Sequence, residues 1–481
     1  PLGVEVDASR AVRYLERAGE VASHAGLLAA AIDHVRAAIA LAPAEEHARL
    51  YERLGDCALA GDAAMEGYQR ALDAWRAQSG TEVQPDPLTG ARLLRKLLSV
   101  YWWWGASFSV ALSLEESAAM HAEALRLAEQ AGDEDEQWRV RLALLDAFGN
   151  TGTREEREER ERERDVCAAA VAHFERRGDW PALYLALDVY ATYSRMLGAH
   201  EEALAATRRC LEWPQLPWWA RANALNMIAA AYLFQPDFDA CLAAAREALA
   251  QVRPGDPVAL LSGTTSSAAW AAYLTGRWSE LTWLRETHAL IWEEAQLVPG
   301  LMRAPLFTGN LPMLAVALAR EERVAADAIA AQMERMLNPS HPQTQGKLSI
   351  VAAYLADDPD RLDLEALAES QGSRYLSVTF LVERGVPVPA WLIQRLRDQG
   401  HASNTLLAEL AEAVNSGDGA RLAEAIAAAE GFHLVPLAAR TRIVLAQRTG
   451  DAAHLELARP VLERLGDRQF LRRLEEVQSA L

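Results

Sequence analysis

The fold is decided by residues 265–291, which read TSSAAWAAYLTGRWSELTWLRETHALI. Ala268 and Ala272 keep the first half slim, because small residues at steps of three and four let a neighbouring helix approach closely. Gly276 supplies the backbone conformation that ends a helix, and a second apolar helix begins at Trp278. The stretch therefore predicts a helical hairpin, and most of the chain reads as variations on it.

Length and composition point to a repeated helical architecture. A chain of 481 residues is too long for one ordinary hydrophobic core, so it forms either several domains or one elongated array. Alanine, leucine, arginine and glutamate dominate, whereas β-branched residues are sparse. Only short runs such as residues 379–388 are candidates for strands. We expect an all-α fold.

The charge balance limits the possible partners. The formal net charge of −19 would repel a nucleic-acid backbone or an anionic membrane surface. No apolar run approaches the roughly 20 residues that a membrane span needs, and no signal-peptide pattern is present. We expect a cytoplasmic protein without direct nucleic-acid or membrane contact. The cysteines are too widely spaced for a metal motif and are expected to be free, buried thiols: Cys57, Cys167, Cys210 and Cys241.

Repeats begin at the start of the chain. One hairpin pattern of large and small residues recurs at Leu15, Ala18, Gly19, Ala22, Gly26, Ala31, Val35, Ala38 and Pro43. A second unit occupies residues 54–71, and a loop rich in proline and glycine follows at residues 79–90. We expect one continuous solenoid in three parts: N-terminal hairpins in residues 1–80, central repeats in 91–300, and degenerate repeats with a capping helix in 301–481.

Residues 154–164, REEREERERER, place opposite charges three and four positions apart along a helix. Such pairs stabilise a helix by only about 0.2–0.5 kcal/mol each. We expect a solvated helix extension, and the alternative is a docking site for a charged partner.

Several stretches together resemble one bacterial family. They are the repeats at residues 15–43 and 54–71, the hairpin with Gly276-Arg277-Trp278, and residues 461–466, VLERLG. The chain resembles the C-terminal tetratricopeptide-repeat (TPR) regions of STAND-class signalling ATPases, including those fused to nucleotide cyclase or LuxR-type DNA-binding domains. The resemblance implies a right-handed solenoid that acts as a sensor. Such a region holds the ATPase inactive until an inducer or a protein binds.

No catalytic motif is carried over with this resemblance. The nearest phosphate-loop sequence, Gln345-Gly346-Lys347-Leu348, lacks the first glycine and the Ser or Thr after the lysine. We therefore expect no enzymatic activity, no cofactor and no metal in this chain. Any ATPase or effector domain would lie on another part of a parent protein, and it would be a partner of the repeats.

The resemblance also implies which positions face the concave surface, where a protein segment or a small-molecule inducer would bind. In the three central units these are Asp188, Thr192, Arg195, Asn223, Asn226, Phe234, Ser266, Trp270 and Tyr273. Amide, guanidinium and aromatic groups on one surface suit a peptide backbone, a carboxylate or a sugar. The alternative is that Trp270 and Tyr273 pack on adjacent repeats.

Other aromatic and polar residues have simpler expected roles. Trp278 follows the turn glycine and should pack in the core. His288 stands where the repeat usually needs a small residue, which predicts a local widening of the helix pair. The run Trp102, Trp103 and Trp104 covers nearly all directions around a helix, so it is either covered by a loop or is a protein-contact patch. The sequence thus supports a regulatory sensor first and a constitutive assembly scaffold second.

Overall fold

The computed structural model describes residues 8–59, 61–77, 85–104, 112–151, 157–253, 256–297, 303–337, 342–368, 374–398 and 401–481. The first helices are α1 (Ala8–His24), α2 (Leu28–Leu41), α3 (His47–Ala58), α4 (Gly61–Ala77), α5 (Pro87–Trp104), α6 (Leu114–Ala131), α7 (Glu134–Thr151) and α8 (Arg157–Arg177). The central helices are α9 (Trp180–Met196), α10 (His200–Cys210), α11 (Trp218–Phe234), α12 (Phe238–Ala250), α13 (Ser262–Leu274), α14 (Leu281–Leu297), α15 (Arg303–Ala319), α16 (Arg323–Met336) and α17 (Pro342–Ala356). The last are α18 (Leu364–Ala368), α19 (Arg374–Glu383), α20 (Ala390–Asp398), α21 (Ala402–Ser416), α22 (Gly419–Gly431), α23 (Val435–Thr449), α24 (Ala453–Leu465) and α25 (Arg468–Ala480).

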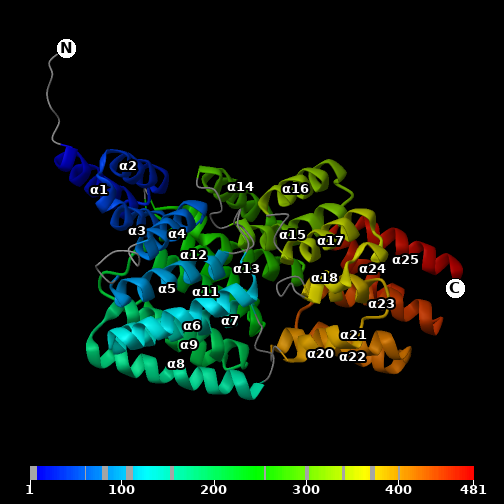
Figure 1. The fold of residues 1–481 in the computed structure, drawn as a ribbon. Coiled ribbons are helices and arrows are strands. Elements are labelled where there is room, and N and C mark those ends of the chain that lie inside the picture. Colours follow the sequence, from blue (N-terminus) through cyan, green and yellow to red (C-terminus); the bar gives the residue numbers. More distant parts are fainter. Residues whose placement is uncertain are drawn as a thin grey trace, which may run out of the picture.

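The all-α prediction is confirmed, since the described residues contain helices and no strand. Helical hairpins stack side by side along the chain (Figure 1). Helix α13 contacts α11 and α15 as well as its hairpin partner α14, which is the contact pattern of a helical-repeat array. The possible strand at residues 379–388 was wrong, because α19 continues to Glu383. None of the described helices combines the length and the apolar character needed to cross a bilayer.

The central hairpin forms as its sequence predicts. Gly276 adopts a φ of 72°, and the Arg277 amide donates a 2.9 Å hydrogen bond to the Ala272 carbonyl, which closes the end of α13. Trp278 is only 2% exposed and stacks almost parallel to Tyr273 at 6.4 Å between ring centroids. The core position of Trp278 is therefore confirmed.

The C-terminal helices return to the central repeats. Helix α23 contacts α13, and α25 contacts α15, although each pair is far apart in the sequence. The turn at Gly276 lies directly against these helices. A Cβ atom added there would stand 2.9 Å from a methyl carbon of Leu465 and 3.5 Å from one of Val435. The array is therefore closed by contacts between distant repeats as well as by contacts between neighbours.

One buried arginine forms the centre of this closure. Arg440, which is 2% exposed, donates hydrogen bonds to the Tyr273 hydroxyl at 3.0 Å, to Glu383 Oε1 at 2.8 Å and to Asp467 Oδ2 at 2.8 Å. Its guanidinium carbon also lies 4.5 Å from the ring centroid of Phe470. Because a buried ion is costly unless its charge is paired, this network holds α13, α19, α23 and α25 in one arrangement.

Both oxygens of Asp467 accept hydrogen bonds, whereas Glu383 Oε2 is buried without a hydrogen-bond partner among the described residues. Asp467 also accepts a hydrogen bond from the Phe470 amide, and so it caps α25. Burial raises the pKa of Glu383, while Arg440 and Arg384 oppose that rise. Arg384 lies 3.8 Å from Glu383 Oε2, and its guanidinium carbon is 3.6 Å from the Phe380 ring centroid. Two arginines and two acids thus share one buried site.

His288 is a buried structural residue. Its Nε2 lies 3.0 Å from the Thr265 hydroxyl, and its Nδ1 lies 3.2 Å from the Asn310 side-chain oxygen. The space for the ring comes from Gly309 on α15, where a Cβ atom would stand 2.5 Å from His288 Cε1. Burial lowers the pKa of His288 to about 4.

The charged stretch at residues 154–164 is only partly solvated, which corrects the prediction. Arg160 and Glu163, one turn apart on α8, are both buried. Arg160 Nη1 donates a hydrogen bond to the Met196 carbonyl at the end of α9. The four cysteines are buried and free, as expected. The side chains of Trp102, Trp103 and Trp104 lie outside the described residues, so that prediction stays open.

Removing the central arginine should destabilise the protein strongly. Arg440→Ala leaves Glu383 and Asp467 buried without their cation, and we expect a loss of about 3–5 kcal/mol in unfolding free energy, measured by urea denaturation. Arg421→Ala is the matched control, because Arg421 pairs with Glu412 at a half-exposed position and its loss should cost about 1 kcal/mol or less. Equal losses in the two variants would contradict the role of Arg440.

His288 should make the protein less stable in acid. Its native pKa is below the unfolded value of about 6.5, so its contribution is complete above pH 6.5 and is lost as the pH falls towards 4. The limiting slope is about 1.4 kcal/mol per pH unit. His288→Gln should flatten this part of the stability–pH curve, whereas His34→Gln on α2 should leave it unchanged. A His288→Gln curve parallel to that of the wild type would refute this.

Candidate functional site

The sequence-predicted site residues lie on α9, α11 and α13, which are the first helices of three successive hairpins. Several of these residues join neighbouring repeats. Asn223 donates hydrogen bonds to Asp188 Oδ1 at 3.0 Å and to the Tyr184 hydroxyl at 2.9 Å, which links α11 to α9. Ser266 lies within 2.7 Å of the Pro305 carbonyl and so links α13 to α15. Thr192 is buried in α9. The hydrogen bonds of Asn223 and Ser266 thus connect helices of neighbouring repeats.

Asn226 occupies a space that a glycine provides. A Cβ atom at Gly263 would stand 2.4 Å from Asn226 Oδ1, so the side chain of Asn226 on α11 packs directly on the backbone of α13. Asn223 and Asn226 are both half-buried. Both side chains are therefore partly open to solvent.

Trp270 and Tyr273 are covered by helices of the same chain. Trp270 is 7% exposed and meets Tyr375 of α19 edge to face at 6.0 Å, and Tyr273 is 1% exposed beneath Arg440 of α23. The expectation that these rings line an open groove is therefore wrong, because both are buried, and the alternative of packing on adjacent repeats does not name these partners. The packing partners are helices that are far away in the sequence.

Arg195 belongs to a second contact between the central repeats and the C-terminal helices. We name the junction cluster the four residues Arg195 of α9, His200 of α10, Phe234 of α11 and His401, which directly precedes α21. The guanidinium carbon of Arg195 lies 5.1 Å from the Phe234 ring centroid. The His401 ring stacks on Phe234 at 4.1 Å with an interplanar angle of 19°, and its centroid is 5.7 Å from that of His200.

The junction cluster is electrostatically unbalanced. Burial lowers the pKa of Arg195 to about 10, against the opposing effect of Asp188. The pKa of His401 falls well below its ordinary value, first because of burial and then because of Arg195, His200 and Arg160. Burial and the charge of Arg195 also lower the pKa of His200. Cationic or potentially cationic groups therefore face one another across this contact.

Several nitrogen atoms of the cluster lack hydrogen bonds. Within the described part of the chain, Arg195 Nε, His200 Nδ1 and His401 Nδ1 are shielded from solvent and have no hydrogen-bond partner. Native proteins satisfy most of their buried polar atoms, so three such atoms at one contact mark an unusual place. The sequence predicted Arg195 but missed the two histidines, because neither belongs to a recognisable motif.

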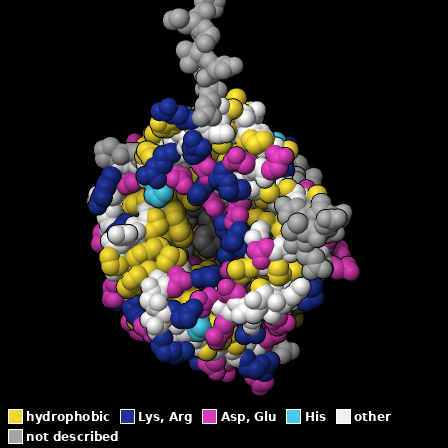
Figure 2. Space-filling view, turned by 60° about the vertical axis from the view of Figure 1, so that its left-hand side comes forward, with side chains coloured by type: hydrophobic (Ala, Val, Ile, Leu, Met, Phe, Trp, Pro, Cys, Tyr) yellow, Lys and Arg dark blue, Asp and Glu magenta, His cyan; other side chains and the backbone are white. Residues whose placement is uncertain are grey.

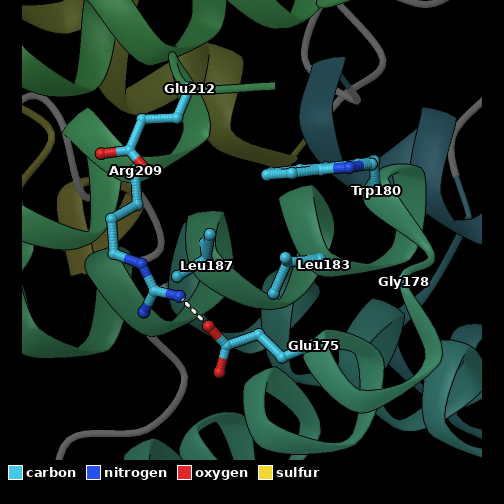
Figure 3. Close-up of a pocket in the computed structure, with 7 residues that line it drawn as sticks. All are labelled: Glu175, Gly178, Trp180, Leu183, Leu187, Arg209 and Glu212. Atoms are coloured by element: carbon cyan, nitrogen blue, oxygen red, sulfur yellow. Dashed lines mark hydrogen bonds and ion pairs between the residues drawn. The ribbon is translucent and has the colours of Figure 1, made fainter. Parts of the chain in front are cut away.

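A small pocket lies elsewhere on the central repeats (Figure 3). It has a volume of about 260 Å³ and lies between the end of α8, α9 and the end of α10. Leu183 and Leu187 lie between Trp180 on one side and Arg209 on the other, and Arg209 pairs with Glu175. The pocket offers an aromatic ring beside a paired charge, and no repeat position in the sequence pointed to it.

The N-terminal repeats carry a ladder of ion pairs. Figure 2, which turns the side of the early helices forward, shows a hollow with basic side chains along its edge and a hydrophobic patch beside it. Pairs that join successive inner helices are Arg53–Glu20, Arg92–Glu52, Lys96–Asp56 and Arg95–Glu136, at 2.6–2.9 Å. These cations are already matched by acids of a neighbouring repeat. The described ranges hold no group of three or more metal-ligating side chains suited to an ion.

Filling the space that Asn226 uses should be destabilising. Gly263→Ala forces Asn226 to move, and we expect a loss of about 1–3 kcal/mol in unfolding free energy, measured by urea denaturation. Gly431→Ala is the control, since a Cβ atom at that helix end meets nothing within 4 Å. A Gly263→Ala protein as stable as Gly431→Ala would show that Asn226 does not depend on this space.

Comparisons of the chain with known protein families and with curated proteins found no match. A function for the chain therefore rests on the chemistry and packing of its own residues.

Proposed function

We propose that the chain is a non-enzymatic regulatory solenoid of TPR-like repeats that binds a small molecule or a protein segment. In this proposal it is the sensor region of a bacterial signal-transduction ATPase or transcriptional regulator. The observation that carries the proposal is a difference between two contacts, each of which joins the central repeats to the C-terminal helices. In the Arg440 network each buried charge faces an opposite charge, although Glu383 Oε2 has no hydrogen bond among the described residues. The junction cluster instead brings Arg195 together with two histidines.

Such an arrangement suits a switch. In a repeat array each unit is stabilised mainly by its neighbours, so a contact between distant repeats can open while the helices stay folded. A ligand that binds one arrangement better than the other shifts the balance between them by its difference in affinity. The incompletely satisfied junction cluster is the weaker contact, and a ligand there would have the largest effect.

A catalytic role finds less support. Thr265, His288 and Asn310 place a hydroxyl, an imidazole and an amide in a row, an order that also occurs in hydrolytic sites. Their exposed fractions are 0%, 2% and 4%, so a substrate has no access to them. Their hydrogen bonds join α13, α14 and α15 instead. We therefore assign this row to stability.

The proposal is tested by a thermal-shift screen of metabolites and peptides. We expect at least one compound to raise the melting temperature, because a ligand at about 100 times its dissociation constant adds about 2.7 kcal/mol to stability. The same compound should change the radius of gyration in small-angle X-ray scattering.

The effect should depend on the half-buried face of α9 and α11. The double variant Arg195→Ala, Asn226→Ala should lose the thermal shift, and Arg421→Ala on α22 should keep it. Compounds that stabilise the double variant as well as the wild type would place binding elsewhere. A concentration-dependent oligomer that no compound affects would favour a constitutive scaffold.

A further inference from the structure

We propose that the junction cluster is a binding site for a tetrahedral oxyanion, such as the phosphate group of a small molecule, which holds the two halves of the chain together. This inference rests on the proposed function and specifies the ligand chemistry of that function. It starts from Arg195, His200 and His401, whose side chains meet beside Phe234.

The cluster contains nitrogen atoms that can donate hydrogen bonds but have no acceptor among the described residues. Arg195 Nε always carries a proton, and a histidine Nδ1 carries one in the imidazolium form or in one neutral tautomer. No acceptor among the described residues reaches any of these three atoms, and each is shielded from water. A buried donor without an acceptor costs free energy. An anion with several oxygen atoms would supply the missing acceptors at one position.

Two helix N-termini reinforce the positive potential. Helix α10 begins at His200 and α21 begins directly after His401. Neither N-cap residue, Ala199 or His401, provides a side-chain acceptor to the first backbone amides of its helix. Such amides and the helix dipole favour an anion at this end. The unpartnered His401 side chain, 4% exposed, gives an independent reason to place an anion here.

The nearby acids do not neutralise the cluster. Asp188 acts on Arg195 through space, but its Oδ1 accepts a hydrogen bond from Asn223. Glu201 follows His200 at an exposed position. Arg160 on α8 adds positive charge beside His401, and Asp398 on α20 acts on Arg160 through space. Asp398 accepts a hydrogen bond from Gln394. These acids lie around the cluster, and none bonds to its three free nitrogen atoms.

The geometry favours a tetrahedral anion over a planar one. A carboxylate takes the two parallel N–H groups of an arginine fork, whereas here single nitrogen atoms come from α9, α10 and the start of α21. Arg195 and His200 are half-buried, and His401 is buried. Phe234 walls one side and carries no polar group.

Anion binding would couple directly to closure. Arg195, His200 and Phe234 belong to the central repeats, while His401 belongs to the C-terminal helices. An anion that touches both sides bridges them. Without it, burial and the charge of Arg195 keep the pKa values of His200 and His401 below the ordinary value, because a proton on either ring would place a second cation at this contact.

The test measures sulfate binding to the full chain by isothermal titration calorimetry at pH 6 and pH 8, with sodium chloride keeping the ionic strength constant. Sulfate does not titrate in this range, so a change in affinity reports on the protein. We expect binding at least tenfold tighter at pH 6, because the bound anion would raise the pKa of the two histidines and the complex would take up a proton that the free protein does not hold. Inorganic phosphate at pH 8 is the second probe and should compete with sulfate.

Matched variants decide the outcome. His401→Gln and His200→Gln should each weaken sulfate binding at least tenfold at pH 6, and His34→Gln on α2 should bind like the wild type. If His401→Gln does not fold, the half-buried His200→Gln decides alone. Unchanged binding in His200→Gln, or an equal loss in His34→Gln, overturns the proposal.

X-ray scattering separates this inference from the proposed function. Sulfate should make the wild-type chain more compact at pH 6. Sulfate that binds through His200 without changing the radius of gyration would support the anion site and overturn its role in closure. A screening compound that changes compactness while sulfate does not bind would overturn the anion site and leave the sensor function standing.

Discussion

The fold depends on one buried guanidinium. Arg440 can lie inside the protein only because Glu383, Asp467 and Tyr273 surround it, and these partners come from three other helices. A buried arginine without its acids would be strongly unfavourable, so the network permits one arrangement of α13, α19, α23 and α25. Hydrophobic packing between repeats tolerates sliding, whereas this set of charge-assisted hydrogen bonds does not. The position of the C-terminal helices follows from it.

The two contacts between distant repeats differ in kind. Around Arg440, cations and acids are paired, and aromatic rings such as Phe470 and Trp278 exclude water. Around His401, nitrogen atoms face one another with few acceptors. The first contact fixes the packing of α13, α19, α23 and α25. In the proposed function, the second is the contact that a ligand would complete.

Local sequence patterns predicted the hairpins well, because the period of a helix and the turn at Gly276 are properties of neighbouring residues. Trp278 was placed correctly for the same reason. The pairing of Tyr273 with Arg440 could not be predicted, since the two residues are 167 positions apart. The burial of Trp270 likewise depends on Tyr375 of the distant helix α19. For the same reason, Arg160 looked solvated within its run of charges but is covered by tertiary packing. The expected concave positions stay a prediction, and long-range packing decides which of those side chains remain partly open.

The contact between α13 and α23 also fixes the number of hairpins that lie between these two helices. Helical-repeat arrays change length in evolution by duplication or loss of whole units, which is harmless where each unit touches only its neighbours. Adding or removing one hairpin between α13 and α23 would displace Tyr273 from Arg440 by the full width of a repeat. The hairpins α1–α2 and α3–α4 precede the closed segment and carry no such restriction. Insertions and deletions of repeats should therefore be confined to the N-terminal end, while the interval from Tyr273 to Arg440 is conserved in length.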